Sequence, residues 1–180
     1  MSLNLKSASN VEAVVRTGFV YLRPHHVAMV QARGPYAVSA AEAWDKMFDW
    51  MRKAGLLKDV GTGYGLLFDD PRETPPERCR YGACIGIDNN WLSLVPEVMS
   101  LRRLPGGAYA RSRHVGGPHG LGIAISKVRN EGLAQEGLMV DRTRPLIEIY
   151  LDNPFTVPVE KQRVDVCIPV AVTDVFGRAA

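Results

Sequence analysis

The chain has 180 residues, of which 46% are hydrophobic and 23% are charged, as in an ordinary globular protein of one domain or of two halves sharing a core. A formal charge of +3 is too small to indicate nucleic-acid binding by itself. No apolar run approaches the ~20 residues that a membrane helix needs, and the N-terminus lacks a signal-peptide pattern. We therefore expect a cytoplasmic protein with no membrane partner.

Metal and cofactor sites are not indicated. The three cysteines form no C-x-x-C pair, and the four histidines are too scattered to supply clustered zinc ligands. Asp69-Asp70 and Asp152-Asn153 resemble acidic pairs, but both precede a proline, where turn chemistry explains them better. The sequence predicts neither a metal nor another cofactor.

The elements are predicted in chain order from apolar spacing and turn residues. Residues 1–19 are interpreted as an N-terminal extension of a domain at 20–175. A strand then ends at Gly34-Pro35, because proline removes a backbone donor. A helix with apolar residues at helical spacing follows, and two strands close this first half, which covers about residues 20–88. The helix residues are Trp44, Met47, Phe48 and Met51, and the strands are roughly Gly63–Phe68 and Arg80–Ile87.

The second half repeats this plan after a linker at 89–97. One constant offset carries Asp69 onto Asp152, Gly34-Pro35 onto Gly117-Pro118 and Cys84 onto Cys167. The half covers about residues 98–172 and ends in strands at Leu146–Leu151 and Arg163–Val170. We expect an α+β fold made of a duplicated strand-helix-strand-strand module. Its two antiparallel half-sheets would be related by a pseudo-two-fold axis, with a central ligand groove between them.

Side chains alternate along the strand at Leu146–Leu151. Ile147, Ile149 and Leu151 form an aliphatic face that we expect to pack on the helix. Glu148 and Tyr150 would then face the groove. Their counterparts at the same offset are Gly65 and Leu67, so a glycine lies opposite a glutamate and leaves room beside the charge.

Six motifs carry a resemblance to the GyrI-like effector-binding domains, which occur at the C-terminus of many AraC-type and some MerR-type transcription regulators. The resemblance covers about residues 20–172. The second helix departs from the family, because Gly120 and Gly122 lie where a bulky residue is usual. The motifs are ARGPY (Ala32–Tyr36), AWDKMFDW (Ala43–Trp50), DDP (Asp69–Pro71), LPGGAYA (Leu104–Ala110), HVGGPH (His114–His119) and EIYLDNP (Glu148–Pro154).

The resemblance implies a groove that recognises bulky lipophilic compounds, often cationic, with Glu148 as the pocket acid. A carboxylate in an apolar cleft is costly unless it is paired, and a cationic ligand supplies the pair. His119 takes the place of Tyr36 in the second half and could reach the groove mouth. The candidate aromatic walls are Tyr36, Trp91, Tyr109 and Tyr150, while Phe68 and Trp44 are assigned to the core.

Simpler interpretations stay open for these residues. Glu148 could be a solvent-facing strand residue paired with Arg163 or Arg144. Tyr150 could be a packing aromatic, and Trp91 could cover the edge of the core rather than the ligand. His119 could be an ordinary surface histidine.

Three functions compete. The first is the effector-sensing domain of an AraC-type regulator whose DNA-binding part is absent from this chain, since the residues before position 20 are too few for a helix-turn-helix. The second is a stand-alone protective protein that sequesters a toxic compound. The third is a hydrolase in which Glu148 is the general base. The sequence shows no second catalytic group, so an enzyme is the least favoured of the three.

Overall fold

The computed structural model describes residues 17–59, 61–87, 90–133 and 137–172. The first half holds β1 (Gly18–Leu22), β2 (His25–Arg33), α1 (Tyr36–Lys53), β3 (Gly63–Leu67) and β4 (Arg80–Gly86). The second holds β5 (Ser100–Leu104), β6 (Gly107–Val115), α2 (Leu121–Lys127), β7 (Leu138–Val140), β8 (Leu146–Tyr150) and β9 (Arg163–Val172). Short 3-10 helices cover Leu57–Asp59, Pro76–Arg78, Leu92–Leu94, Pro118–Gly120 and Val159–Lys161.

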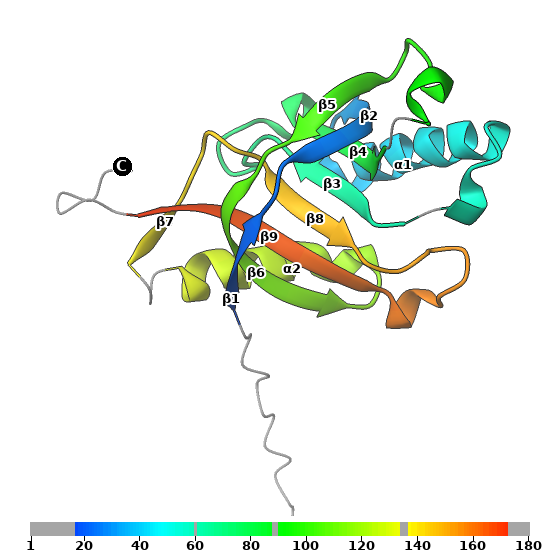
Figure 1. Cartoon of the computed structure of the whole chain (residues 1–180). Helices are drawn as coiled ribbons and strands as arrows, with labels where there is room; N and C mark the ends of the chain where they lie inside the picture. Colours follow the sequence, from blue (N-terminus) through cyan, green and yellow to red (C-terminus); the bar gives the residue numbers. More distant parts are fainter. Residues whose placement is uncertain (1–16, 60, 88–89, 134–136, 173–180) are drawn as a thin grey trace, which may run out of the picture.

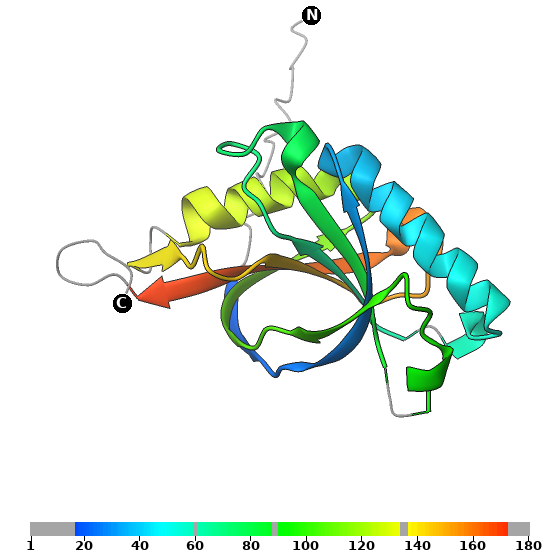
Figure 2. The same cartoon turned by 90° about the horizontal axis from the view of Figure 1, so that it is seen from above.

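The strands form an antiparallel sheet in the order β1-β6-β9-β8-β3-β4-β2-β5, with β7 added beside β9. Figure 1 labels the strands, and Figure 2 shows the sheet curled into a half-barrel. The predicted α+β class is confirmed. The two predicted half-sheets are joined edge to edge, because β3 of the first half pairs with β8 of the second. The edge strands are exchanged: β1 pairs with β6, and β5 pairs with β2.

Both helices lie on the same face of the sheet (Figure 2). α1 buries Ser39, Ala43, Met47 and Met51, which are four residues apart and so form one stripe. Gly55, at φ 75°, ends the helix in the left-handed conformation that favours glycine. Among the described residues, no helix is long and apolar enough to cross a membrane.

α2 is much shorter than α1 and continues directly into a π-helix at Val128–Gly132. Leu121 and Val128 are buried against the sheet. Glycines at 120, 122 and 132 weaken the helical propensity of this segment, so packing on the sheet supplies most of its stability.

The face of the sheet away from the helices encloses a core of its own. Ile147 is fully buried there beside Tyr109, Leu104 and Cys167, and Ile149 packs against the same cluster. The prediction that Ile147 and Ile149 pack on a helix was therefore wrong. Strand alternation separates two faces but does not say which face the helices cover, and here the curl of the sheet buries the other one.

Candidate functional site

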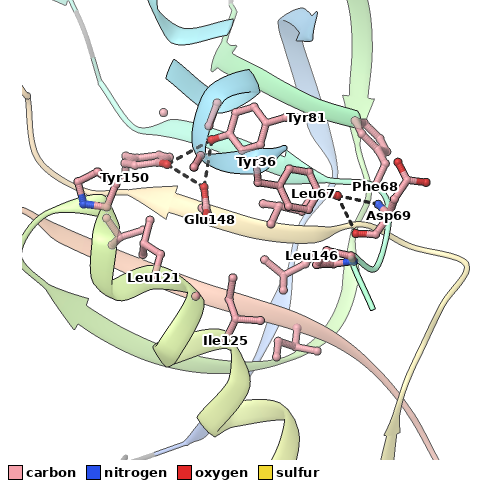
Figure 3. Close-up of a pocket in the computed structure, with 18 of the residues that line it drawn as sticks. Tyr36, Leu67, Phe68, Asp69, Tyr81, Leu121, Ile125, Leu146, Glu148 and Tyr150 are labelled. Carbon is pink, nitrogen blue, oxygen red and sulfur yellow. Dashed lines mark hydrogen bonds between the residues drawn. The ribbon is translucent and has the colours of Figure 1, made fainter. Parts of the chain in front are cut away.

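A pocket of about 1090 Å³ lies between α1 and α2, above the seam where β3 pairs with β8 (Figure 3). Its floor comes from the sheet face that carries Leu67, Tyr81, Leu146, Glu148 and Tyr150. A volume of this size holds a drug-sized molecule. Helices and groove thus share one face of the sheet.

Glu148 is the centre of a buried hydrogen-bond cluster. The Tyr150 hydroxyl donates to Glu148 Oε2 at 2.7 Å, and the Tyr81 hydroxyl donates to the same oxygen at 3.0 Å. Trp44 Nε1 in turn donates to the Tyr81 hydroxyl at 3.0 Å. Figure 3 draws Glu148 between the two tyrosines. Every hydrogen bond that the carboxylate accepts from a described residue goes to Oε2, so Oε1 stays available to a ligand.

Gly65 makes room for this cluster. It pairs directly with Glu148 in the β3–β8 register. A β-carbon at residue 65 would lie only 2.6 Å from Glu148 Oε2 and still closer to the Tyr81 hydroxyl oxygen. Only glycine leaves that space empty without displacing either group.

The carboxylate of Glu148 is only 5% exposed and forms no ion pair with a described residue. Burial raises its pKa, and the hydrogen bonds from Tyr150 and Tyr81 oppose that rise. The alternative partners are engaged elsewhere, since Arg163 binds Asp152 at 2.7 Å and Arg144 binds Asp141 at 2.7 Å. The simple interpretation of Glu148 as a solvent-facing, arginine-paired residue was therefore wrong.

Aromatic rings form one wall of the pocket. The ring of Trp44 stacks on Phe48 with centroids 5.3 Å apart and meets Tyr150 edge-on at 5.2 Å. The hydroxyl of Tyr36 donates to the Asp69 carbonyl at 2.7 Å and accepts from the Asp69 amide at 3.0 Å. The ring is thereby fixed at the end of β3 where Phe68 also lines the pocket.

The opposite wall, on α2, is aliphatic and open. Leu121 and Ile125 point from α2 toward the cavity in Figure 3, and Gly122 and Ser126 add little bulk beside them. A β-carbon at Gly122 would meet nothing within 4 Å, so the second helix leaves open space there. The departure seen in the sequence at Gly122 has this geometric result.

The rim carries paired charges that follow the acid-proline motifs. Asp69 accepts three hydrogen bonds from Arg80: one from its backbone amide at 2.8 Å and two from its guanidinium. Asp152 is bound to Arg163 in the same way, through the backbone amide at 2.7 Å and the guanidinium. Both aspartates thus fix the strand that follows. Among the described residues, no three histidine, cysteine, aspartate or glutamate side chains gather as a metal site.

The structure places most of the predicted site residues around this pocket. Tyr36, Leu67, Glu148 and Tyr150 line it, exposed His119 lines its edge, and Gly65 lies beneath the carboxylate. Their role in binding stays a prediction.

Two predicted walls lie elsewhere. Tyr109 is fully buried on the other face of the sheet, where its hydroxyl donates to the Pro105 carbonyl at 3.2 Å. Trp91 packs on the core near α1, because the turn that follows it is tied to α1 by a hydrogen bond from Trp50 to the Leu94 carbonyl. Neither residue lines the pocket, so both predictions were wrong.

Sequence reasoning also missed lining residues. Tyr81 was not considered, although it is adjacent to Arg80 in a strand whose alternation sends it to the Glu148 face. Trp44 and Phe68 were assigned to the core, yet both line the pocket as well. The helix stripe that packs on a sheet is also the stripe that meets a cavity beneath it, so spacing alone could not separate the two roles.

With this geometry established, comparison with known proteins identifies the family. Residues 17–171 match the GyrI-like small molecule binding domain. The chain belongs to the GyrI-like family. The chain is also similar to the probable transcriptional regulator YgiV of Escherichia coli, with 26% identity over 130 aligned residues. The alignment covers 70% of this chain and 78% of YgiV.

Several solved structures share the fold. The C-terminal domain of EcmrR superposes with a TM-score of 0.69 at 13% identity, covering 88% of this chain and 99% of that one. EcmrR in a complex with DNA gives a TM-score of 0.70 at 14% identity, covering 87% of this chain and 57% of that one. SAV2435 bound to tetraphenylphosphonium gives a TM-score of 0.58 at 13% identity, covering 86% of this chain and 93% of that one. At these identities the likeness concerns the fold.

Proposed function

We propose that this GyrI-like domain binds a bulky lipophilic cation between its two halves and acts as the effector-sensing part of an AraC-type bacterial transcription regulator. Glu148 is the counter-ion in this proposal. The observation that carries it is a buried carboxylate without a cationic partner among the described residues, in a large pocket with an aromatic wall. In this role DNA is contacted by a separate helix-turn-helix part and not by this fold.

The physical chemistry of the pocket favours a cation over other ligands. A buried carboxylate without a partner costs free energy, and a ligand cation would offset that cost. Trp44, Phe48 and Tyr150 present rings that attract a cation through their faces at about 0.5–2 kcal/mol each. The known binding of tetraphenylphosphonium by SAV2435, which shares this fold, supports the same ligand class.

A duplicated module explains why the pocket lies at the seam. When each strand is replaced by its counterpart in the other half, the sheet has the same strand order read from its opposite edge. The sequence counterparts Gly65 and Glu148 also pair with each other. These observations support a pseudo-two-fold axis through that pair. The scaffold would be symmetric, while the acid occupies one half only.

The test compares tetraphenylphosphonium with tetraphenylborate, an anion of the same shape, and with neutral triphenylphosphine oxide. Thermal unfolding is followed for the wild type and for Glu148→Gln. A ligand at roughly 100 times its dissociation constant stabilises a protein by about 2.7 kcal/mol. We expect stabilisation by the phosphonium alone and its loss in Glu148→Gln. Equal stabilisation of the wild type by the borate, or unchanged phosphonium binding in the variant, would overturn the proposal.

Hydrolysis of a reactive electrophile is a second candidate function. The raised pKa of Glu148, caused by burial, suits a general base that activates water. Turnover of an electrophilic ester or epoxide that is lost in Glu148→Gln, with tetraphenylphosphonium as a competitive inhibitor, would favour this function over sensing or sequestration.

A further inference from the structure

Arg129 forms a second charged position in the pocket, away from Glu148. It lies on the π-helix at Val128–Gly132, and π-turns within helices are frequent at functional sites. Its side chain is 17% exposed, and Nη1 donates to Asp70 Oδ2 at 3.1 Å. Its Nε is buried and has no hydrogen-bond partner among the described residues. Buried donors are nearly always bonded, so this N–H can donate to a further acceptor.

The charges around Arg129 do not balance. Asp70 is already bound by Arg72, whose Nη2 donates to Oδ2 at 2.7 Å and whose Nε donates to Oδ1 at 3.1 Å. Two guanidinium groups therefore share one carboxylate. The neighbouring acids each have an arginine of their own: Asp69 with Arg80, Glu73 with Arg142, and Asp141 with Arg144.

The pocket thus has an excess positive charge at Arg129 and an unmatched negative charge at Glu148. Glu148 lies beside the middle of β3, and Arg129 binds Asp70, which follows the end of that strand. Gly65 is the cross-strand partner of Glu148, and Asp70 comes five residues further along the chain. At ~3.3 Å per extended residue, these five residues span at most about 16 Å. The open aliphatic wall of α2 borders the path between them.

We propose that the ligands of highest affinity are amphoteric: a lipophilic cation at Glu148 is joined by an apolar linker to a carboxylate, which Arg129 binds. This rests on the proposed function, since the cationic end is held as described above. An arginine that shares its acid with another arginine accepts a second carboxylate at little cost. Hydrogen bonds between charged groups are about twice as strong as those between neutral groups.

The probes are carboxybutyl- and carboxydecyl-triphenylphosphonium, each with its methyl ester as the uncharged match. Dissociation constants are measured by isothermal titration calorimetry. We expect the long-chain acid to bind the wild type about tenfold more tightly than its ester, as one charged hydrogen-bonded pair implies. The short-chain acid and its ester should differ much less, because that linker does not span the distance.

Variants separate ligand binding from a structural role. In Arg129→Gln the long-chain acid should lose its advantage while its ester binds as before. Arg142→Gln, which changes another pocket arginine, is the matched control and should preserve the advantage. Asp70→Asn keeps the Oδ1 that accepts the Arg72 amide and releases Arg129, so it should strengthen binding of the acid. A purely structural Asp70–Arg129 pair predicts no such gain.

The outcomes also separate the two proposals. If neither esters nor acids bind the wild type, the cation site itself is refuted. If the esters bind and are lost in Glu148→Gln, but acid and ester bind equally at every chain length, the cation site stands and the role of Arg129 is overturned. A gain for the acid that survives Arg129→Gln would also overturn it.

Discussion

Gly65 and Glu148 pair with each other across the β3–β8 seam. Because Gly65 has no side chain, the carboxylate of Glu148 can occupy the space beside it. This relationship joins sequence to site in one step. A strand that crosses the centre of a sheet tolerates glycine poorly, because glycine has no side chain to pack. Here the glycine is required because two tyrosine hydroxyls and a carboxylate converge above it.

Gly65→Ala should destabilise the fold by about 1–3 kcal/mol, the usual cost of overpacking a filled interior. The new methyl group would displace the carboxylate or the Tyr81 hydroxyl, so cation affinity should fall as well. Urea unfolding and calorimetry measure the two effects. Gly86→Ala is the matched control, because a β-carbon there meets nothing within 4 Å. Equal stability of the two variants would contradict the assigned role of Gly65.

Cation binding should depend on pH through Glu148. Its pKa is raised in the folded protein above the usual 4.5, so the carboxyl group is protonated in the folded protein at pH values where it would already be ionised in an unfolded chain. Tetraphenylphosphonium affinity should therefore rise with pH through the raised pKa. Over the same window the free energy of unfolding of the free protein should fall, because the folded state binds more protons. Glu148→Gln should abolish both dependences, and a wild-type affinity independent of pH would refute the assignment.

Tyr150→Phe should move the pH dependence of cation binding to higher pH. The hydroxyl donates to the ionised carboxylate at 2.7 Å and so lowers the pKa of Glu148. Without this hydrogen bond, less opposes the rise in the pKa of Glu148 that burial causes. Tyr109→Phe is the control, since that hydroxyl lies outside the pocket. A shift of equal size in the control would show that the pH dependence has another origin.

Trp44→Phe should weaken tetraphenylphosphonium binding by roughly 0.5–2 kcal/mol, since indole attracts a cation more strongly than benzene does. Ligand-induced quenching of tryptophan fluorescence should mostly disappear with it. In Trp91→Phe both quenching and affinity should be retained, because Trp91 packs on the core outside the pocket. If Trp91→Phe removed the quenching instead, the location of the ligand would need revision.

Acid stability should depend on the two aspartates at the strand ends. Hydrogen bonds from Arg80 and Arg163 lower the pKa of Asp69 and Asp152. Their contribution is present above the ordinary carboxyl pKa and is lost as pH falls through the lowered values. The double variant Asp69→Asn with Asp152→Asn should lose stability at neutral pH and show a shallower further loss on acidification. Circular dichroism at several pH values measures this, with Asp45→Asn on α1 as the control.

The element order was predictable because its signals are local. Gly-Pro breaks, helical spacing in α1 and alternation in β8 each depend on a few neighbouring residues. The constant offset even indicated that Gly65 and Glu148 belong together. The exchange of β1 and β5 between the halves depends on distant backbone pairing, for which no side-chain pattern exists.

The site was predictable only where alternation and the offset agreed, as at Glu148, Tyr150 and Leu67. Tyr109 was misplaced because its strand has two buried faces, so a buried aromatic residue there fits either one. Arg129 could not be foreseen, since the π-helix that carries it changes the residue spacing on which a helical projection depends.

The β3–β8 seam also restricts how the protein can enclose a ligand. Five residues of each strand pair there, so the floor passes from one half to the other through continuous backbone hydrogen bonds. Two lobes that swung about a hinge would have to break this ladder. A compound must therefore enter past the rim, between the segment around Asp70 and α2, over a floor that is one continuous sheet. Ligands of different shape would be accommodated by the helices that form the pocket walls, above the fixed β3–β8 floor.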